Sequence, residues 1–198
     1  MSERRSTRRA NRARPAKREK RAPGVLPFIL RFVGFWVGSL LLAESTPVLD
    51  DWAVGHTVAS LQAALQLLTG SGYSAGSSVG TGHLHFSIVP DCTPVMPILL
   101  FSSACLAFPA TWRWKILGIM SATLILWLYN LVRVLVLFLV MSRWPAAFDF
   151  VHVYLWQTTT LIVVFLLFVC WLRMQRAAGG HAPAPNTVAV PSSAVAGR

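Results

Sequence analysis

Residues 116–140 read ILGIMSATLILWLYNLVRVLVLFLV. This stretch decides the fold because it is long, mostly apolar and carries a single charged side chain, Arg133. At a rise of about 1.5 Å per residue, a helix of this length crosses the roughly 30 Å hydrocarbon layer of a membrane. Three other apolar runs extend the pattern, so we predict about four transmembrane helices, over residues 25–43, 94–110, 116–140 and 151–172. The predicted fold class is an all-α membrane protein.

The composition of the whole chain argues against a soluble enzyme. Of the 198 residues only 13% are charged, against roughly 25% in soluble domains, and the mean hydropathy is +0.56. The formal net charge is +11, but ten of the eighteen Lys and Arg residues fall within residues 1–21. The three cysteines form no Cys-x-x-Cys pair, so neither a disulfide framework nor a structural zinc site is expected.

The segments outside the spans complete the expected organisation. A disordered basic tail (1–22) and a disordered polar tail (177–198) flank a membrane domain over residues 23–176. Asp50 and Asp51 are expected to cap a helix that runs to Thr69 and lies on the outer membrane surface. Residues 70–82 predict a flexible Gly/Ser loop, residues 83–89 a short strand, and residues 112–115 a tight basic turn. Thr93 followed by Pro94 predicts the start of the second span.

The positive residues favour one orientation in the membrane. With the N-terminal tail in the cytoplasm, Arg113 and Lys115 also lie inside, as do Arg173 and Arg176 near the C-terminus. The basic tail is explained by this orientation and by contact with anionic lipids, so no nucleic acid is expected as a partner. A cleaved signal peptide is the alternative for residues 25–43, but the run is long and lacks a small-residue cleavage site.

Three polar side chains are predicted to share the outer membrane boundary. Cys92 directly precedes the second span, His152 lies in the first turn of the fourth, and Arg133 lies about 26 Å along the third from Ile116. A thiol, an imidazole and a guanidinium at one depth suit acyl transfer from a peptide. Cys92 is the candidate nucleophile, His152 the candidate general base and acid, and Arg133 the candidate group that stabilises negative charge on oxygen.

Two neighbours are expected to support these residues, and each member of the trio has a structural alternative. Asn130 lies three residues before Arg133 and is expected to hold it, while Asp149 is expected to cap the last helix or to orient His152. In the alternative, Cys92 is an unreactive buried side chain, His152 is an ordinary interfacial residue and Arg133 snorkels to the membrane surface.

No metal and no cofactor are expected. His83 and His85 alternate on the predicted strand, but no carboxylate follows at a ligand spacing. Cys105 and Cys170 lie far along the spans from Cys92, so Cys92 is expected to be a free thiol.

Three short motifs resemble those of the exosortase/archaeosortase family of membrane cysteine transpeptidases, and in particular the compact exosortase H type. They are Asp91-Cys92-Thr93 at the head of a span, Asn130-Leu131-Val132-Arg133 late in the next, and Phe148-Asp149-Phe150-Val151-His152 at the start of the last. The resemblance covers about residues 86–173. It implies that Cys92 is the nucleophile, with Arg133 and His152 beside it.

The resemblance also implies a substrate class and a location. The expected substrates are secreted proteins that end in a recognition motif, a transmembrane helix and a basic tip, cleaved at the outer face of the bacterial cytoplasmic membrane. The expected acceptor of the new carboxyl end is an envelope polysaccharide or a lipid. The alternative hypothesis is a non-enzymatic membrane subunit of an export or envelope-polysaccharide system, in which Arg133 serves helix packing or lipid contact.

Overall fold

The computed structural model of the chain describes residues 25–82 and 84–179. The predictions for the basic tail (1–22), for His83 and for residues 180–198 therefore lie outside the described residues. Residues 177–179, predicted to belong to the C-terminal tail, are the last turn of a helix.

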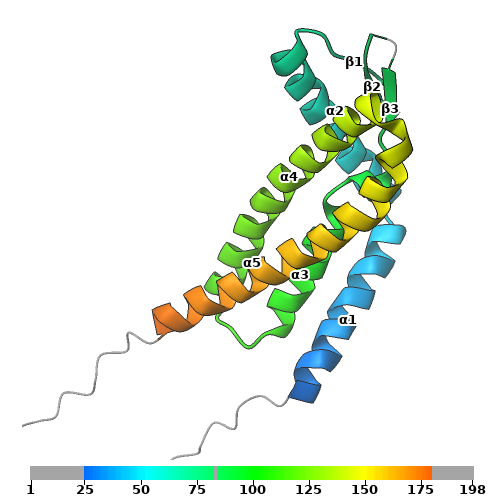
Figure 1. Cartoon of the computed structure of the whole chain (residues 1–198). Coiled ribbons are helices and arrows are strands. Elements are labelled where there is room, and N and C mark those ends of the chain that lie inside the picture. The colour runs from blue at the N-terminus through cyan, green and yellow to red at the C-terminus, as the bar shows by residue number, and fades with distance from the viewer. Residues whose placement is uncertain (1–24, 83, 180–198) are drawn as a thin grey trace, which may run out of the picture.

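The described chain is mostly helical (Figure 1). α1 spans Val25–Glu44, α2 Pro47–Thr69, α3 Val95–Ala107, α4 Trp112–Arg143 and α5 Trp156–Gly179. A π-helix, Phe150–Leu155, leads directly into α5. Three segments are long and apolar enough to cross a membrane: Val25–Glu44, Trp112–Arg143 and Pro145–Ala178. They correspond to the first, third and fourth predicted spans.

The second predicted span is a shorter helix than expected. α3 has 13 residues, a length of about 20 Å, because it ends at Ala107: Phe108, which precedes Pro109, is extended. The residues before α3, Pro90–Cys92, form a separate 3₁₀ helix. Pro94, and not Thr93, occupies the N-cap position of α3. The Thr93 hydroxyl instead donates a hydrogen bond to the Pro90 carbonyl oxygen over 2.7 Å. A separate 3₁₀ turn therefore lies between the last strand and α3, and Cys92 is the last residue of this turn.

α2 begins earlier than predicted. Its first residue is Pro47, whose fixed φ and missing N–H suit the first turn of a helix, and Thr46 occupies the N-cap position. Asp50 and Asp51 lie inside the helix and do not cap it, which corrects the prediction. The sequence predicts an apolar stripe on this helix at Val54, Val58, Leu61, Leu65 and Leu68. It is confirmed at Val58, Leu61 and Leu65, which are buried, but not at Leu68, which is exposed.

Residues 70–82 are not a flexible loop, and this prediction was wrong. β1 (Tyr73–Ala75), β2 (Ser78–Thr81) and β3 (Leu84–Ser87) form an antiparallel sheet in the order β1-β2-β3. Val79 anchors β2 because its side chain is fully buried. Gly80 allows the strands to approach, since an added Cβ would lie 2.6 Å from the Leu84 carbonyl oxygen. The predicted strand at residues 83–89 is confirmed over the four residues of β3.

Residues 112–115, predicted to form a tight turn, are the first turn of α4. α5 packs on this turn, because the Trp171 indole N–H donates to the Trp114 carbonyl oxygen over 2.9 Å. The Lys115 ammonium donates to the Leu106 carbonyl oxygen over 2.7 Å and so satisfies a carbonyl in the last turn of α3. These contacts join α3, α4 and α5 at one end of the helix bundle.

The core has two clusters, one at each end of the bundle. The first lies between α2, the sheet, Cys92 and the C-terminal half of α4; the second lies between α3, α5 and the N-terminal half of α4. We call α2 with the sheet the cap (residues 47–87). In Figure 1 the cap lies at one end of the bundle, and the N-terminal end of α1, the α3–α4 connection and the C-terminal end of α5 lie at the other.

Candidate active site

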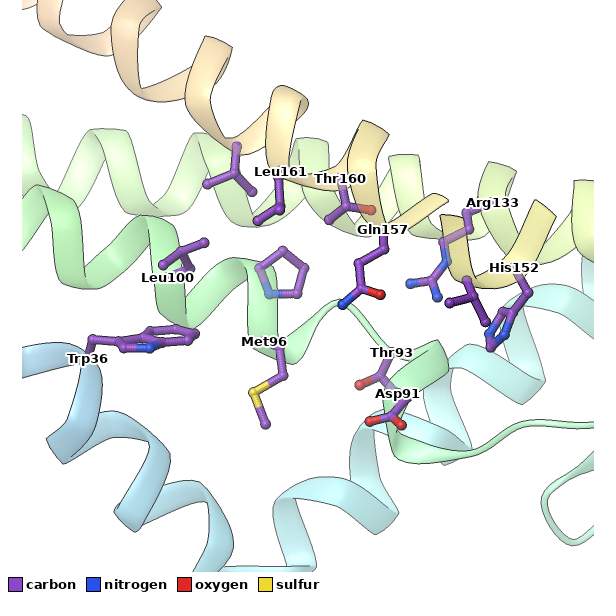
Figure 2. A pocket seen from close by; sticks show the side chains of 13 residues that line it. Trp36, Asp91, Thr93, Met96, Leu100, Arg133, His152, Gln157, Thr160 and Leu161 are labelled. Carbon is purple, nitrogen blue, oxygen red and sulfur yellow. The ribbon is translucent and has the colours of Figure 1, made fainter. Parts of the chain in front are cut away.

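A cavity of about 500 Å³ opens between the helices just below the cap. Figure 2 shows that polar side chains line one side of it and apolar side chains the other. The polar residues come from four segments: the 3₁₀ turn before α3, α4, the π-helix and α5. The lining residues are Trp36, Asp91, Thr93, Met96, Pro97, Leu100, Arg133, His152, Val153, Gln157, Thr160, Leu161 and Val164.

Cys92 and His152 lie next to each other although 60 positions separate them in the chain. The distance between Cys92 Sγ and His152 Nε2 is 4.0 Å, the long end of a hydrogen bond to sulfur. In the tautomer with the imidazole proton on Nδ1, Nε2 is free to accept the thiol proton. The geometry therefore brings a nucleophile and a base into contact, as the sequence predicts.

The Cys92 sulfur is covered in this structure. Cys92 is 3% exposed and packs in the cap-side core cluster with Val58, Phe86 and Val134. It is absent from the cavity wall, whereas His152, whose Nε2 lies 4.0 Å from the sulfur, lines the cavity. A substrate carbonyl reaches the sulfur only after the neighbouring side chains move. The prediction of three side chains in one open pocket is thus correct for His152 and Arg133 and wrong for Cys92.

Asn130 does not hold Arg133, which corrects the prediction. Its side-chain N–H donates to the carbonyl oxygen of Cys92 over 2.9 Å. Asn130 is buried in the middle of α4, so the bond ties the turn that carries the thiol to the longest helix. A buried amide that lost this partner would be costly, so the bond fixes the position of Cys92.

Stacking and not a carboxylate positions the His152 imidazole. The ring stacks on Phe148, with ring centroids 5.4 Å apart and an interplanar angle of 11°. Arg133, Asp91 and Asp149 are the charged groups that act on it electrostatically. Within residues 25–82 and 84–179, no carboxylate forms a hydrogen bond or an ion pair with His152. Asp149 is at the N-cap position of the π-helix but makes no side-chain cap bond, so its predicted capping role was wrong.

His152 lies in an unusual helical turn. The segment Phe150–Leu155 is a π-helix, a form that is rare and is found mostly as single turns, often at functional sites. Its wider turn changes which side chains face the bundle, and the cavity face here carries both His152 and Val153. Adjacent residues of a regular helix do not share a face so closely.

Arg133 enters the cavity with its charge uncompensated. Its Nε is buried and has no hydrogen-bond partner, and nothing in the described part of the chain forms an ion pair with the guanidinium. Asp91 lines the opposite wall (Figure 2) without reaching it. A cation in this position attracts an oxygen atom that carries negative charge. Arg133 therefore points into the bundle, which favours a binding role over snorkelling.

The sequence prediction missed Gln157 and Thr160, which line the cavity from α5. Both are polar residues at the start of an apolar span, and Gln157 follows His152 by five positions. That polar break in a predicted span was a usable signal, because polar groups inside membrane segments face the bundle interior or a cavity.

No metal centre is built from the residues that the structure describes: no group of three or more His, Cys, Asp and Glu side chains lies together there. His85 is exposed on the sheet, where it contacts the Tyr73 hydroxyl at 3.2 Å, and it does not line the cavity. Cys92, Cys105 and Cys170 are all free thiols.

Comparisons of the chain with protein-family models, with curated proteins and with solved structures found no match.

Proposed function

We propose that the protein is a membrane cysteine peptidase or transpeptidase that acts on secreted proteins at the outer face of the cytoplasmic membrane. The observation that carries this proposal is the Cys92–His152 pair, 4.0 Å apart, beside a cavity that also holds the unpaired Arg133 guanidinium. The resemblance of the three motifs to the exosortase family supports the same activity and the same roles.

The residues suggest the following reaction. His152 Nε2 takes the thiol proton, and Cys92 Sγ attacks the carbonyl carbon of the scissile peptide bond. The carbonyl oxygen becomes negatively charged, and Arg133 stabilises it. When the intermediate collapses, the C–N bond breaks, the leaving nitrogen takes the proton from His152, and the acyl group stays on sulfur as a thioester. An amine or hydroxyl of the acceptor, or water, then attacks the thioester and releases the product.

The first step of this reaction requires the sulfur to become accessible. Because Cys92 is buried and does not line the cavity, substrate binding must displace side chains that cover the sulfur. A covered nucleophile is also protected from oxidation and from water until substrate arrives.

The burial of Cys92 also favours a second candidate function, a non-enzymatic subunit of an export or envelope-polysaccharide system. In that case Cys92 is a small apolar core residue, and Arg133 binds the negatively charged group of a lipid or of a partner. This candidate predicts that the thiol is dispensable.

The two functions are separated by a substitution series in cells. The probe is a secreted reporter protein fused to a C-terminal segment from the source genome that consists of a short motif, an apolar helix and a basic tip. We expect Cys92→Ala and Cys92→Ser to abolish cleavage of the reporter while the protein level is unchanged, because neither side chain forms a thioester. Cys170→Ala, at an exposed thiol, and Cys105→Ala should retain cleavage. Full cleavage by Cys92→Ala would end the enzyme hypothesis.

A further inference from the structure

Gln157 lines the cavity but has no role in the proposed reaction. Gln157 projects from α5 into the middle of the cavity, between Arg133 and His152 on one side and Leu100 and Leu161 on the other (Figure 2). Among the residues that the structure describes, its side-chain amide has no hydrogen-bond partner. It therefore offers two N–H donors and one carbonyl acceptor to a ligand.

The other neutral polar groups around it are already engaged. The Thr93 hydroxyl donates to the Pro90 carbonyl oxygen over 2.7 Å. The Thr160 hydroxyl donates to the Trp156 carbonyl oxygen over 2.6 Å and contacts the Tyr129 hydroxyl at 3.3 Å. Gln157 is consequently the neutral side chain with the most unused hydrogen-bonding capacity on the described cavity wall.

Beyond Gln157 the wall becomes apolar. Leu100, Leu161 and Val164 line the cavity there and also line a second hollow of about 200 Å³ between α1 and α5. The remaining residues of that hollow are Phe32, Phe101, Ala104, Phe165 and Phe168. The cavity thus passes from a charged end to an apolar end, and Gln157 marks the change.

A ligand that fits this profile is amphiphilic and still carries hydrogen-bonding groups where it enters the apolar part. A lipid acyl chain has none at that point. A peptide chain has them, because the first four N–H groups of a helix have no partner within the helix, and neither does the extended segment before it. Leaving such groups unpaired in apolar surroundings is costly, so a site for them needs a donor and an acceptor.

We propose that Gln157 binds the main chain of the substrate next to the scissile bond, on the side that continues into the membrane. Its Oε1 accepts a hydrogen bond from a peptide N–H and its Nε2 donates one to a peptide carbonyl. The contact holds the substrate extended while the bond to be cleaved lies against Arg133 and His152. This inference rests on the proposed peptidase function, and it names the main chain as what the site recognises.

The test uses the full-length protein in lipid nanodiscs and a synthetic peptide that carries the complete C-terminal signal. We expect Gln157→Leu to raise KM about tenfold or more with kcat changed less than threefold, because the lost contact binds substrate and transition state alike. Thr158→Leu is the matched control: Thr158 is the next residue of α5, is exposed and does not line the cavity. It should leave KM unchanged.

A backbone substitution in the peptide shows whether the contact is to the main chain. Replacing one amide N–H at a time by an ester oxygen, from the scissile bond towards the membrane segment, should reveal one position at which the ester raises KM for the wild type. At that position the ester should have no further effect on Gln157→Leu, since the two changes remove the same hydrogen bond.

The outcomes separate this inference from the function on which it rests. If the wild type shows no cleavage that depends on Cys92, both the proposed peptidase function and the main-chain contact of Gln157 are refuted. If cleavage depends on Cys92 but Gln157→Leu has the wild-type KM, or if no ester position couples to Gln157, the enzyme hypothesis stands and the main-chain contact is refuted. A lower KM in Gln157→Leu would indicate an apolar ligand such as an acyl chain and would also refute it.

Discussion

Asn130 and Arg133 lie one turn apart on α4 and contribute in different ways. Asn130 fixes the turn that carries the nucleophile, through its hydrogen bond to the Cys92 carbonyl oxygen. Arg133 extends into the cavity and keeps a buried Nε without a partner. An unpaired guanidinium destabilises the free protein, and a polar ligand that binds there recovers that cost. The residue is therefore better suited to a bound oxygen than to holding the helices together.

We expect Arg133→Lys to lower kcat/KM for the reporter peptide about 10- to 100-fold. Lysine keeps the charge but is a compact ammonium, so it does not reproduce the planar set of donors of a guanidinium. Steady-state kinetics of the purified protein give the measurement. Arg143→Lys is the control, because Arg143 is exposed in the last turn of α4. Wild-type turnover in Arg133→Lys would favour the snorkelling interpretation.

At the scale of single residues, the sequence predicts which side chains lie near one another but not the direction in which each side chain points. The apolar runs place Cys92, Arg133 and His152 at one level of the bundle, where the structure brings them together, because position along a helix follows from residue counts. They say nothing of helix rotation, so the burial of the sulfur was not foreseen. The Asn130 bond joins a side chain to a main-chain oxygen 38 positions away, a contact that no periodic pattern records.

Helix packing at the end opposite the cap depends on a glycine, because any side chain at that position would be too large. Gly118 of α4 lies against the Trp171 indole of α5, and an added Cβ would overlap the indole ring. The same indole N–H donates to the Trp114 carbonyl oxygen, so the ring has little freedom to move aside. This contact sets the close approach of α4 and α5 at that end of the bundle.

We expect Gly118→Ala to destabilise the protein by about 1–3 kcal/mol, as overpacking does in a closely packed interior. Gly38→Ala is the matched control, because Gly38 is also within a helix but has open space where a Cβ would lie. It should be neutral or stabilise the protein slightly, since alanine is the better helix former. Thermal denaturation in detergent, followed by tryptophan fluorescence, gives the comparison. Equal midpoints for the two variants would show that the indole moves aside.

The elements were predicted unevenly for a physical reason. Long apolar helices can be recognised in a sequence by their length and hydropathy, and three of the predicted spans correspond to such helices in the structure. The sheet cannot be recognised in this way, because residues 70–82 are rich in Gly, which has a low strand propensity. β1 and β2 form through pairing with β3 and burial of Val79, and such tertiary contacts are absent from local sequence. The length of α3 was overestimated because the apolar run continues to Ala110, whereas the helix ends at Ala107, ahead of Pro109.

The described part of the molecule gathers most of its charges by sign at opposite ends, with Arg133 in the cavity and Arg143 at the cap end of α4 as the basic exceptions. Arg113 and Lys115 lie at the α3–α4 connection, and Arg173 and Arg176 lie at the end of α5, all opposite the cap. The acidic residues in the described part of the chain lie in or near the cap and at the cavity mouth, namely Glu44, Asp50, Asp51, Asp91 and Asp149. Many large apolar side chains of α1, α4 and α5 are exposed between these two ends. This is the distribution expected of a bundle that spans a membrane with its basic end in the cytoplasm.

Chemical labelling from one side of the membrane tests that orientation, and with it the side on which the cavity opens. In a variant with all three cysteines replaced by alanine, Ser77→Cys introduces a thiol in the exposed β1–β2 turn of the cap, and Pro109→Cys introduces one in the α3–α4 connection. A sulfonated maleimide does not cross the cytoplasmic membrane, because its charge is costly to bury in hydrocarbon. We expect it to label Ser77→Cys in intact cells and Pro109→Cys only after the cells are permeabilised. The opposite pattern would place the cavity at the cytoplasmic side, where a secreted substrate does not arrive, and would contradict the proposed function even if Cys92 proved reactive.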